Sequence, residues 1–139
     1  MKGIKIDHVG VAVRSAEEAA QFYRDVIGLN QIETEILEDR KLKIAMIPIG
    51  ESRIELLEPL EGETTVRNFL EKRGEGIHHL AVLVDDLDEI LKRAVERGYR
   101  VLGEPSYGAG GKRVAFLHPK DLNGVLVELV EEKIAAEEG

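Results

Sequence analysis

Hydrophobic and polar residues alternate along the first part of the chain. Between Ile4 and Val13, three valines fall on one side of the pattern and His8 falls on the other. A period of two is typical of a β-strand with one buried face. We therefore predict a strand over residues 4–13 whose valine face packs against a helix.

The spacing then changes to that of a helix. Ser15 and Glu18 form a capping-box pattern before an apolar stripe, and Gly28 supplies a stop signal. Short alternating or apolar runs bounded by turn residues follow, and they predict three strands, over residues 31–38, 42–49 and 53–58. The first part of the chain is therefore predicted to have the order βαβββ.

The same order returns in the second part. A connecting helix capped by Thr64 or Thr65 is predicted to end near Gly74. A second helix is predicted between Asp86 and Gly98. Strands are predicted over residues 77–84, near 99–102, and over 113–118 and 125–131.

The two parts also match in sequence. The segment around His8 matches the segment around His79, and the strand of Glu55 matches that of Glu128, at a separation of about 70 residues. Such a repeat is too long for a solenoid unit and indicates two fused half-domains. We predict one domain over 1–139, with a first module at 4–60, a connector helix at 61–76, a second module at 77–131 and a charged tail at 132–139.

Composition narrows the possible partners. The net charge of −8 argues against nucleic acid or an anionic membrane as the main partner, and no stretch has the features of a signal peptide or a membrane span. We therefore expect a cytoplasmic protein with a small organic ligand. Since the chain has no cysteine, a metal would need nitrogen and oxygen ligands. The large share of charged residues, 33%, is a weak indication of a thermophile.

Four residues are candidates for such a site. Alternation turns His8 and His79 away from the predicted helices, while His78 falls on the other face. Taken singly, a strand histidine is commonly a hydrogen-bonded core residue and a strand glutamate faces water. The repeat favours one shared metal site formed by His8, Glu55, His79 and Glu128. We favour Co²⁺ as the ion, with Ni²⁺, Mn²⁺ or Zn²⁺ as alternatives.

These residues lie in segments that resemble the vicinal oxygen chelate superfamily, and within it the methylmalonyl-CoA epimerases. The similar segments are Ile6-Asp7-His8-Val9, Ile54 to Leu60, Gly76-Ile77-His78-His79, Gly108-Ala109-Gly110-Gly111 and Phe116 to Lys120. The resemblance implies an α+β fold in which two tandem βαβββ modules form a cupped, mostly antiparallel eight-stranded sheet. It also implies the same four metal ligands, an acyl-CoA substrate and a homodimer.

The implied reaction interconverts (2R)- and (2S)-methylmalonyl-CoA by proton transfer at C2 through a metal-stabilised enolate. Glu128 matches the position of a catalytic base in the family. At least one family member has a second catalytic glutamate, and the matching strand position in this chain is Lys43. We therefore propose Glu55 as the second base, with a purely metal-binding Glu55 as the alternative. Lys43 is a candidate for proton delivery or for holding the substrate carboxylate.

Two further segments carry weaker indications. Lys112 and Arg113 follow a glycine-rich loop and are candidates for contacting CoA phosphates, although the loop is equally typical of a plain hairpin. The segment from His118 to Lys120 is more typical of a turn than of a site.

Other functions remain open within the superfamily. A glyoxalase I-type lactoylglutathione lyase can use the same four ligands, and some members bind small molecules without catalysis. Ring-cleaving dioxygenases need two histidines and one carboxylate, so a fourth ligand at Glu55 argues against them.

Overall fold

The computed structural model of the protein describes residues 1–132, and the chain falls into two compact units. The N-terminal unit comprises His8–His78, and the C-terminal unit comprises Met1–Asp7 together with the chain from His79 onward. The boundaries between these units lie within two strands, β1 and β5, and the predicted division into two modules and a connector, residues 61–76, stays a prediction. Apart from Glu132, the predicted charged tail lies outside the described residues.

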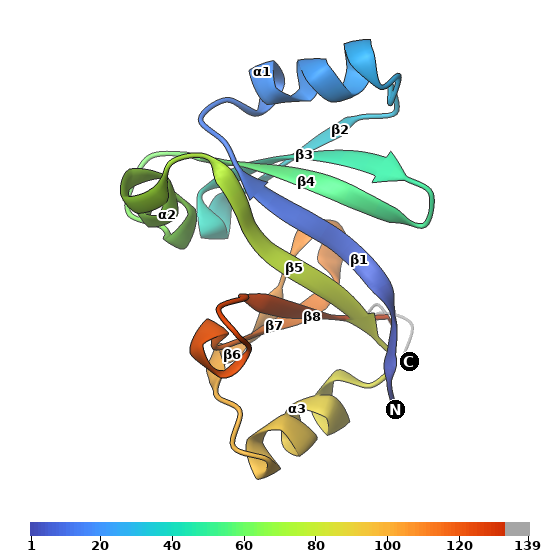
Figure 1. The fold of residues 1–139 in the computed structure, drawn as a ribbon, viewed down its shortest axis with the longest axis vertical. Coiled ribbons are helices and arrows are strands. Elements are labelled where there is room, and N and C mark those ends of the chain that lie inside the picture. The colour runs from blue at the N-terminus through green and yellow to red at the C-terminus, as the bar shows by residue number, and fades with distance from the viewer. Residues whose placement is uncertain (133–139) are drawn as a thin grey trace. The chain divides into compact units, whose positions relative to one another are not determined.

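The N-terminal unit has the predicted order of elements (Figure 1). Its sheet has the order β2-β3-β4-β1, in which β1 and β4 are parallel and the other pairs are antiparallel. Its elements are β1 (Gly3–Ala12, shared with the other unit), α1 (Ala16–Gln21), a π-helical turn (Phe22–Val26), β2 (Glu33–Leu37), a 3₁₀ turn (Glu38–Arg40), β3 (Leu42–Ile49), β4 (Ser52–Pro59) and α2 (Thr65–Arg73).

The C-terminal unit repeats the arrangement. Its strands have the order β5-β8-β7-β6, with β5 and β8 parallel and the other pairs antiparallel. The elements are β5 (Gly76–Val84), α3 (Leu87–Glu96), β6 (Val101–Tyr107), a 3₁₀ turn (Ala109–Gly111), β7 (Arg113–Leu117), a 3₁₀ turn (Pro119–Asp121) and β8 (Val127–Glu131). The predicted α+β class and the repeated βαβββ order are confirmed.

The predicted helix caps are present. The side chains of Ser15, Thr64 and Asp86 each accept a hydrogen bond from the backbone N–H three residues later, at 3.2, 3.0 and 3.2 Å. Such caps satisfy N–H groups that have no partner within the helix. Gly28 and Gly98 have φ angles of 81° and 89°, the left-handed conformation that glycine adopts readily. The stop signals are therefore also correct.

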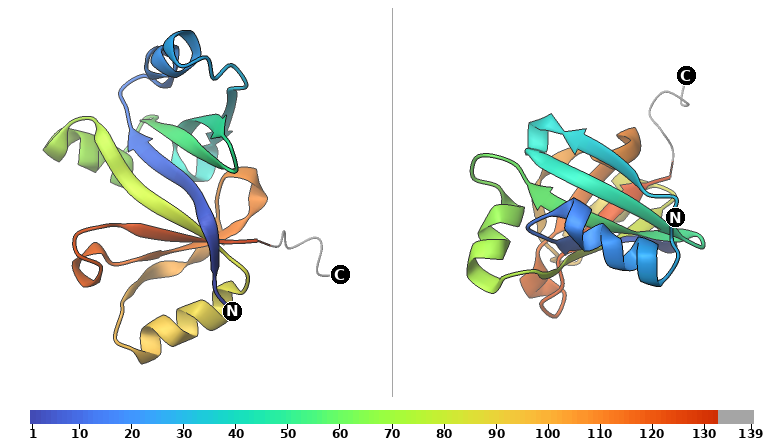
Figure 2. Two further views of the ribbon diagram at one scale, coloured as in Figure 1. Left: turned by 45° about the vertical axis from the view of Figure 1, so that its right-hand side comes forward. Right: turned by 90° about the horizontal axis from the view of Figure 1, so that it is seen from above.

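Helices α1 and α3 each cover one face of the sheet in their own unit, as Figure 2 shows. In the N-terminal unit, Val11 and Val13 pack with Ala16 and Ala20 of α1. In the C-terminal unit, α3 packs on β5, β7 and β8 through a second apolar cluster. The prediction that the valine face of the first strand meets a helix is confirmed, and the opposite strand faces remain for other side chains.

Strand β6 is longer than predicted. It extends to Tyr107, although Gly103 and Pro105 interrupt the strand pattern in the sequence. The pairing with β7 shifts register between Leu102 and Ser106, and β6 lies at the edge of the sheet order. An edge strand tolerates a proline and a bulge because one side of it forms no ladder.

A clasp of hydrogen bonds joins the start of β6 to the turn before β8. Arg100 donates from its backbone N, Nε and Nη2 to the Asp121 carboxylate at 2.9, 3.0 and 2.9 Å. These bonds lower the pKa of Asp121 from 3.8 to about 2, and the side-chain bonds from Arg100 are the main cause.

The clasp predicts a specific dependence of stability on pH. Because the folded pKa of Asp121 lies below its unfolded value, its contribution is present above about pH 4 and is lost as the pH falls toward 2. We expect the urea midpoint of Asp121→Asn to fall less steeply than that of the wild-type protein over this pH range. Asp25→Asn, which removes an exposed carboxylate, is the control and should keep the wild-type dependence. An unchanged slope in Asp121→Asn would contradict the role of the clasp.

No helix within residues 1–132 is both long enough and apolar enough to cross a membrane.

Candidate metal and acid-base site

His8 and Glu55 form a buried pair in the N-terminal unit. His8 is 3% exposed and Glu55 is 2% exposed. Their strands are parallel neighbours, and the His8 Nδ1 atom lies 3.4 Å from Glu55 Oε2. Because Val11 and Val13 contact α1, alternation places His8 on the face opposite the helix, as predicted.

Arg53 holds the Glu55 carboxylate from the same strand. Its Nε atom donates to Glu55 Oε2 at 2.8 Å, and its Nη2 atom forms an ion pair with the same oxygen at 2.8 Å. Residues two apart on a strand share a face, so Arg53 also lies opposite α1. The contacts with His8 and Arg53 both fall on Oε2, so Oε1 is the candidate oxygen for a metal ion or a proton.

His79 and Glu128 form the equivalent pair in the C-terminal unit. The His79 Nε2 atom lies 2.9 Å from Glu128 Oε1, and both residues are buried. The pairs differ in detail, since His8 presents Nδ1 and His79 presents Nε2 to its glutamate. The ring of Phe116, which lies opposite Glu128 in the β7–β8 pair, packs edge-on against the His79 ring at 5.9 Å between centroids.

The face around the second pair is apolar. Ala81, Leu83, Val114 and Val130 form a buried cluster with Phe116 packed against it. By alternation, Ala81 lies on the same face as His79, and Val130 on the same face as Glu128. A dry surrounding of this kind strengthens electrostatic interactions and excludes competing water.

The donor atoms of both pairs fit a divalent first-row ion. Each pair brings an imidazole nitrogen and a carboxylate oxygen within 4.8 Å of one another. Imidazole and carboxylate are the usual ligands of Co, Ni, Mn and Zn when cysteine is absent. Burial of all four side chains distinguishes them from the exposed acidic groups common on protein surfaces.

The comparison with known families agrees with this geometry. Residues 7–116 match the model of the Glyoxalase/Bleomycin resistance protein/Dioxygenase superfamily. The chain belongs to this superfamily. It is the family predicted from the His8, Glu55, His79 and Glu128 segments.

Several similar members of the superfamily are named as epimerases. The ethylmalonyl-CoA/methylmalonyl-CoA epimerase of Cereibacter sphaeroides is 42% identical over 128 residues, which cover 90% of this chain and 96% of that protein. The methylmalonyl-CoA epimerase structure from Mycobacterium tuberculosis has a TM-score of 0.90 at 35% identity and covers 99% and 93% of the two chains. A variant of the Streptomyces coelicolor methylmalonyl-CoA epimerase in complex with 2-nitronate-propionyl-CoA has a TM-score of 0.89 at 39% identity and covers 94% and 98%.

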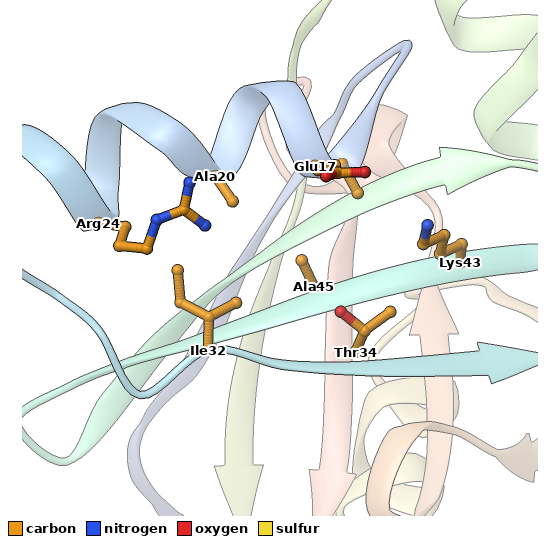
Figure 3. A pocket seen from close by; sticks show the side chains of 8 residues that line it. Glu17, Ala20, Arg24, Ile32, Thr34, Lys43 and Ala45 are labelled. Carbon is orange, nitrogen blue, oxygen red and sulfur yellow. The ribbon is translucent and has the colours of Figure 1, made fainter.

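Lys43 lies on a different face from Glu55. Glu55 stands opposite Met46 in the β3–β4 pair, so these two side chains share a face and Lys43, three residues from Met46, points to the other. Lys43 lines a pocket of about 220 Å³ between α1 and the sheet, together with Glu17, Arg24 and Thr34 (Figure 3). The structure therefore does not support a role for Lys43 beside Glu55.

The β3 residues that do share the face of Glu55 are Leu42, Ile44, Met46 and Pro48. All four are apolar, so within this unit β3 offers no carboxylate as a second base. The chain therefore has no glutamate on β3 that could act as a second base beside Glu55, as the sequence indicated. The β3 residue on that face is Ile44, and not Lys43.

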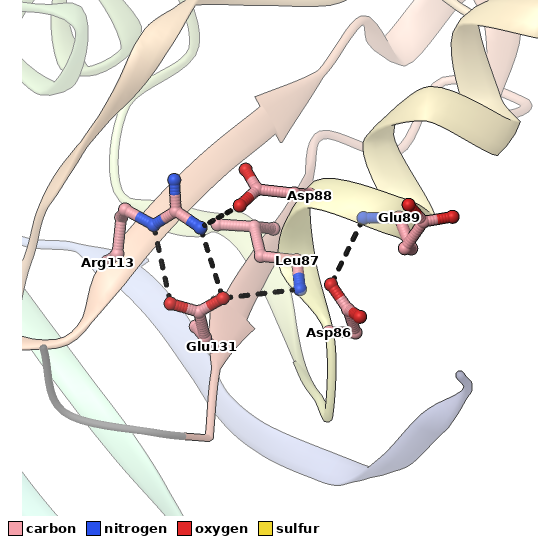
Figure 4. Close-up of polar contacts among 6 residues, drawn as sticks. All are labelled: Asp86, Leu87, Asp88, Glu89, Arg113 and Glu131. Atoms are coloured by element: carbon pink, nitrogen blue, oxygen red, sulfur yellow. Dashed lines mark hydrogen bonds and ion pairs between the residues drawn. The ribbon is translucent and has the colours of Figure 1, made fainter. Parts of the chain in front are cut away.

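Arg113 is held in a structural ion-pair cluster (Figure 4). Its Nη2 atom donates to Asp88 Oδ2 at 2.9 Å and to Glu131 Oε2 at 3.1 Å, and its Nε donates to Glu131 Oε1 at 3.3 Å. Glu131 also accepts from the backbone N of Leu87 at 3.4 Å. These bonds lower the pKa of Asp88 and raise that of Arg113. This arrangement does not support the predicted contact of Arg113 with CoA phosphates, whereas for Lys112 that contact stays a prediction.

The cluster predicts a loss of stability on replacement of Arg113. Arg113→Met leaves the Glu131 carboxylate, 8% exposed, without its cation. The cluster is more buried than a surface salt bridge and less buried than an ion pair in a protein core. We therefore expect a loss of about 2 kcal/mol in the free energy of unfolding. Arg93→Met, on the exposed side of α3, is the control for urea denaturation. Equal stability of the two variants would contradict this account.

The remaining histidines have structural roles. His78 packs edge-on against Phe69 of α2, with 5.2 Å between ring centroids. His118 Nδ1 accepts from the Lys120 backbone N at 3.1 Å and caps a short 3₁₀ turn. Sequence reasoning did not single out Arg53, although its position two residues before Glu55 on one strand already placed both side chains on one face.

Proposed function

We propose that the protein is a metal-dependent epimerase that interconverts (2R)- and (2S)-methylmalonyl-CoA. The observation that carries the proposal is the repeated buried histidine–glutamate pair, one in each unit, on a strand face opposite the helix. Membership of the superfamily and the names of the similar epimerases support the same substrate class.

We propose that His8, Glu55, His79 and Glu128 hold one divalent ion, with Co²⁺ favoured. The support is the equivalence of the two pairs in the sequence repeat and their matching donor types. When bound, such an ion would supply Lewis-acid stabilisation of the negative charge that develops on the substrate oxygens.

Glu128 is the proposed base at C2 of the substrate. Its Oε1 atom lies 2.9 Å from His79 Nε2, and we assign the proton transfer to Oε2. The C2 proton lies between a thioester carbonyl and a carboxylate, and its removal gives a planar enolate. The apolar cluster around Glu128 keeps bulk water from this proton, which favours its return to carbon.

Glu55 is the proposed second acid-base group. Inversion at C2 requires one group to remove the proton from one side of the enolate and another to return it from the opposite side. Glu55 is the repeat partner of Glu128, and its contacts with His8 and Arg53 fall on Oε2, so we assign the proton transfer to Oε1. Arg53 fixes the orientation of the carboxylate through Oε2.

Replacement of Glu55 by glutamine separates acid-base action from metal binding. Gln keeps an oxygen donor but cannot carry the proton, so we expect Glu55→Gln to retain metal and to lose about 100-fold in kcat. Metal content by elemental analysis and epimerisation by circular dichroism of the product provide the two readings. Retention of both would show that Glu55 only binds metal.

The proposed function is tested by two reactions on one metal-loaded sample. We expect epimerisation of methylmalonyl-CoA and no turnover of the glutathione–methylglyoxal hemithioacetal. Turnover of the hemithioacetal alone would favour a glyoxalase I-type lyase. Absence of both activities, together with absence of metal binding, would favour a non-catalytic binding protein.

A further inference from the structure

The glycine-rich loop places Gly108 beside the Glu128 carboxylate. A Cβ atom at Gly108 would lie 3.9 Å from Glu128 Oε2 and 3.4 Å from the nearest methyl carbon of Val114. This is the second oxygen of the carboxylate, since Oε1 is the atom that lies 2.9 Å from His79 Nε2. Gly108 therefore borders the oxygen to which we assign the proton transfer.

The loop fixes Gly108 in this position. The Gly108 backbone N donates to the Lys112 carbonyl at 2.9 Å, and the Gly111 N donates to the Gly108 carbonyl at 3.1 Å. These bonds close a short turn directly before β7, whose Phe116 stands opposite Glu128. The distance between Gly108 and the carboxylate is thus set by backbone structure.

The backbone conformation does not require glycine at this position. Gly108 has φ −107° and ψ −160°, an extended conformation that any residue adopts, whereas Gly110 and Gly111 both have φ 76°. A side-chain methyl group at Gly108 would also make only ordinary van der Waals contacts. What glycine provides here is space next to Oε2.

We propose that Gly108 sets the size of the C2 substituent that the protein accepts. This inference rests on the proposed function, in which Glu128 removes the C2 proton. A base oxygen must approach C2 to about 3 Å, so the alkyl group on C2 lies near the same wall. A hydrogen atom at Gly108 leaves room for one more carbon, which a methyl group would fill.

The inference predicts a change in substrate preference in Gly108→Ala. Wild-type protein should epimerise ethylmalonyl-CoA with a kcat/KM within about 10-fold of that for methylmalonyl-CoA. Since one methylene is commonly discriminated by 10-fold or more in a fitted pocket, Gly108→Ala should lower the ethyl-to-methyl ratio of kcat/KM by about 10-fold. Gly108→Ser, with a side chain slightly larger than alanine, should lower the ratio at least as much.

Gly76→Ala is the matched control, because a Cβ there meets no atom within 4 Å and φ is not positive. Metal content and the thermal midpoint should be unchanged in all three variants. An unchanged ratio in Gly108→Ala and Gly108→Ser would overturn the inference, as would wild-type protein that epimerises the methyl compound but rejects the ethyl compound. If wild-type protein epimerises neither, the proposed function fails and the inference fails with it.

Discussion

Glu128→Gln should lower kcat for methylmalonyl-CoA by about 100- to 10,000-fold, the range for removal of a general base. The carboxylate is 5% exposed and has Phe116 opposite it on β7, so water has little access to replace it as the base. Gln has nearly the same shape, and its oxygen remains available as a ligand. Stopped-flow or circular dichroism measurements at saturating metal give the rate.

Two measurements distinguish the loss of a catalytic base from the loss of bound metal and from a general effect of removing a carboxylate. Metal content should fall much less than kcat, since an amide oxygen still binds a divalent ion. Glu132→Gln, on an exposed neighbouring residue, should leave kcat within about two-fold. A Glu128→Gln protein with near-normal kcat and normal metal content would remove Glu128 from the proposed mechanism.

Removal of either paired histidine should have the second large effect. His8→Ala and His79→Ala change ligands in different units, yet each should weaken metal binding by at least 10- to 100-fold. The physical reason is that one ion shared by two pairs loses a quarter of its protein ligands in either variant. Isothermal titration with Co²⁺ should show one ion per wild-type chain.

The control for these variants is His118→Ala, which removes a turn cap and no proposed ligand. It should bind Co²⁺ as the wild-type protein does. If only one of His8→Ala and His79→Ala loses affinity, the ion is held by one pair alone. Two ions per chain would likewise contradict a shared site.

The strand pattern predicted much of the candidate site. Alternation around His8 and His79 placed both on strand faces opposite the helices, because a buried strand face fixes the parity of every side chain on it. The apolar packing of His78 on Phe69 follows from the same parity. The four proposed metal ligands and the homodimer stay predictions.

Side-chain partners were harder to predict than faces. In the sequence, Arg113 follows a loop and has no obvious acidic partner. Only the packing of β7 against β8 and α3 brings it close to Glu131 and Asp88. The resemblance matched Lys43 to the position of the family's second catalytic glutamate. In the structure the next residue, Ile44, lies on the face of Glu55, because a shift of one residue along a strand moves a side chain to the opposite face.

The exchange of the C2 proton of methylmalonyl-CoA in deuterated buffer tests the central claim most directly. With metal-loaded protein, we expect deuterium to enter at C2 at a rate comparable with epimerisation, to stop entering after treatment with chelator, and to enter again when Co²⁺ is restored. Exchange that persists unchanged in the chelated protein, or no exchange in the loaded protein, would contradict a metal-dependent epimerase.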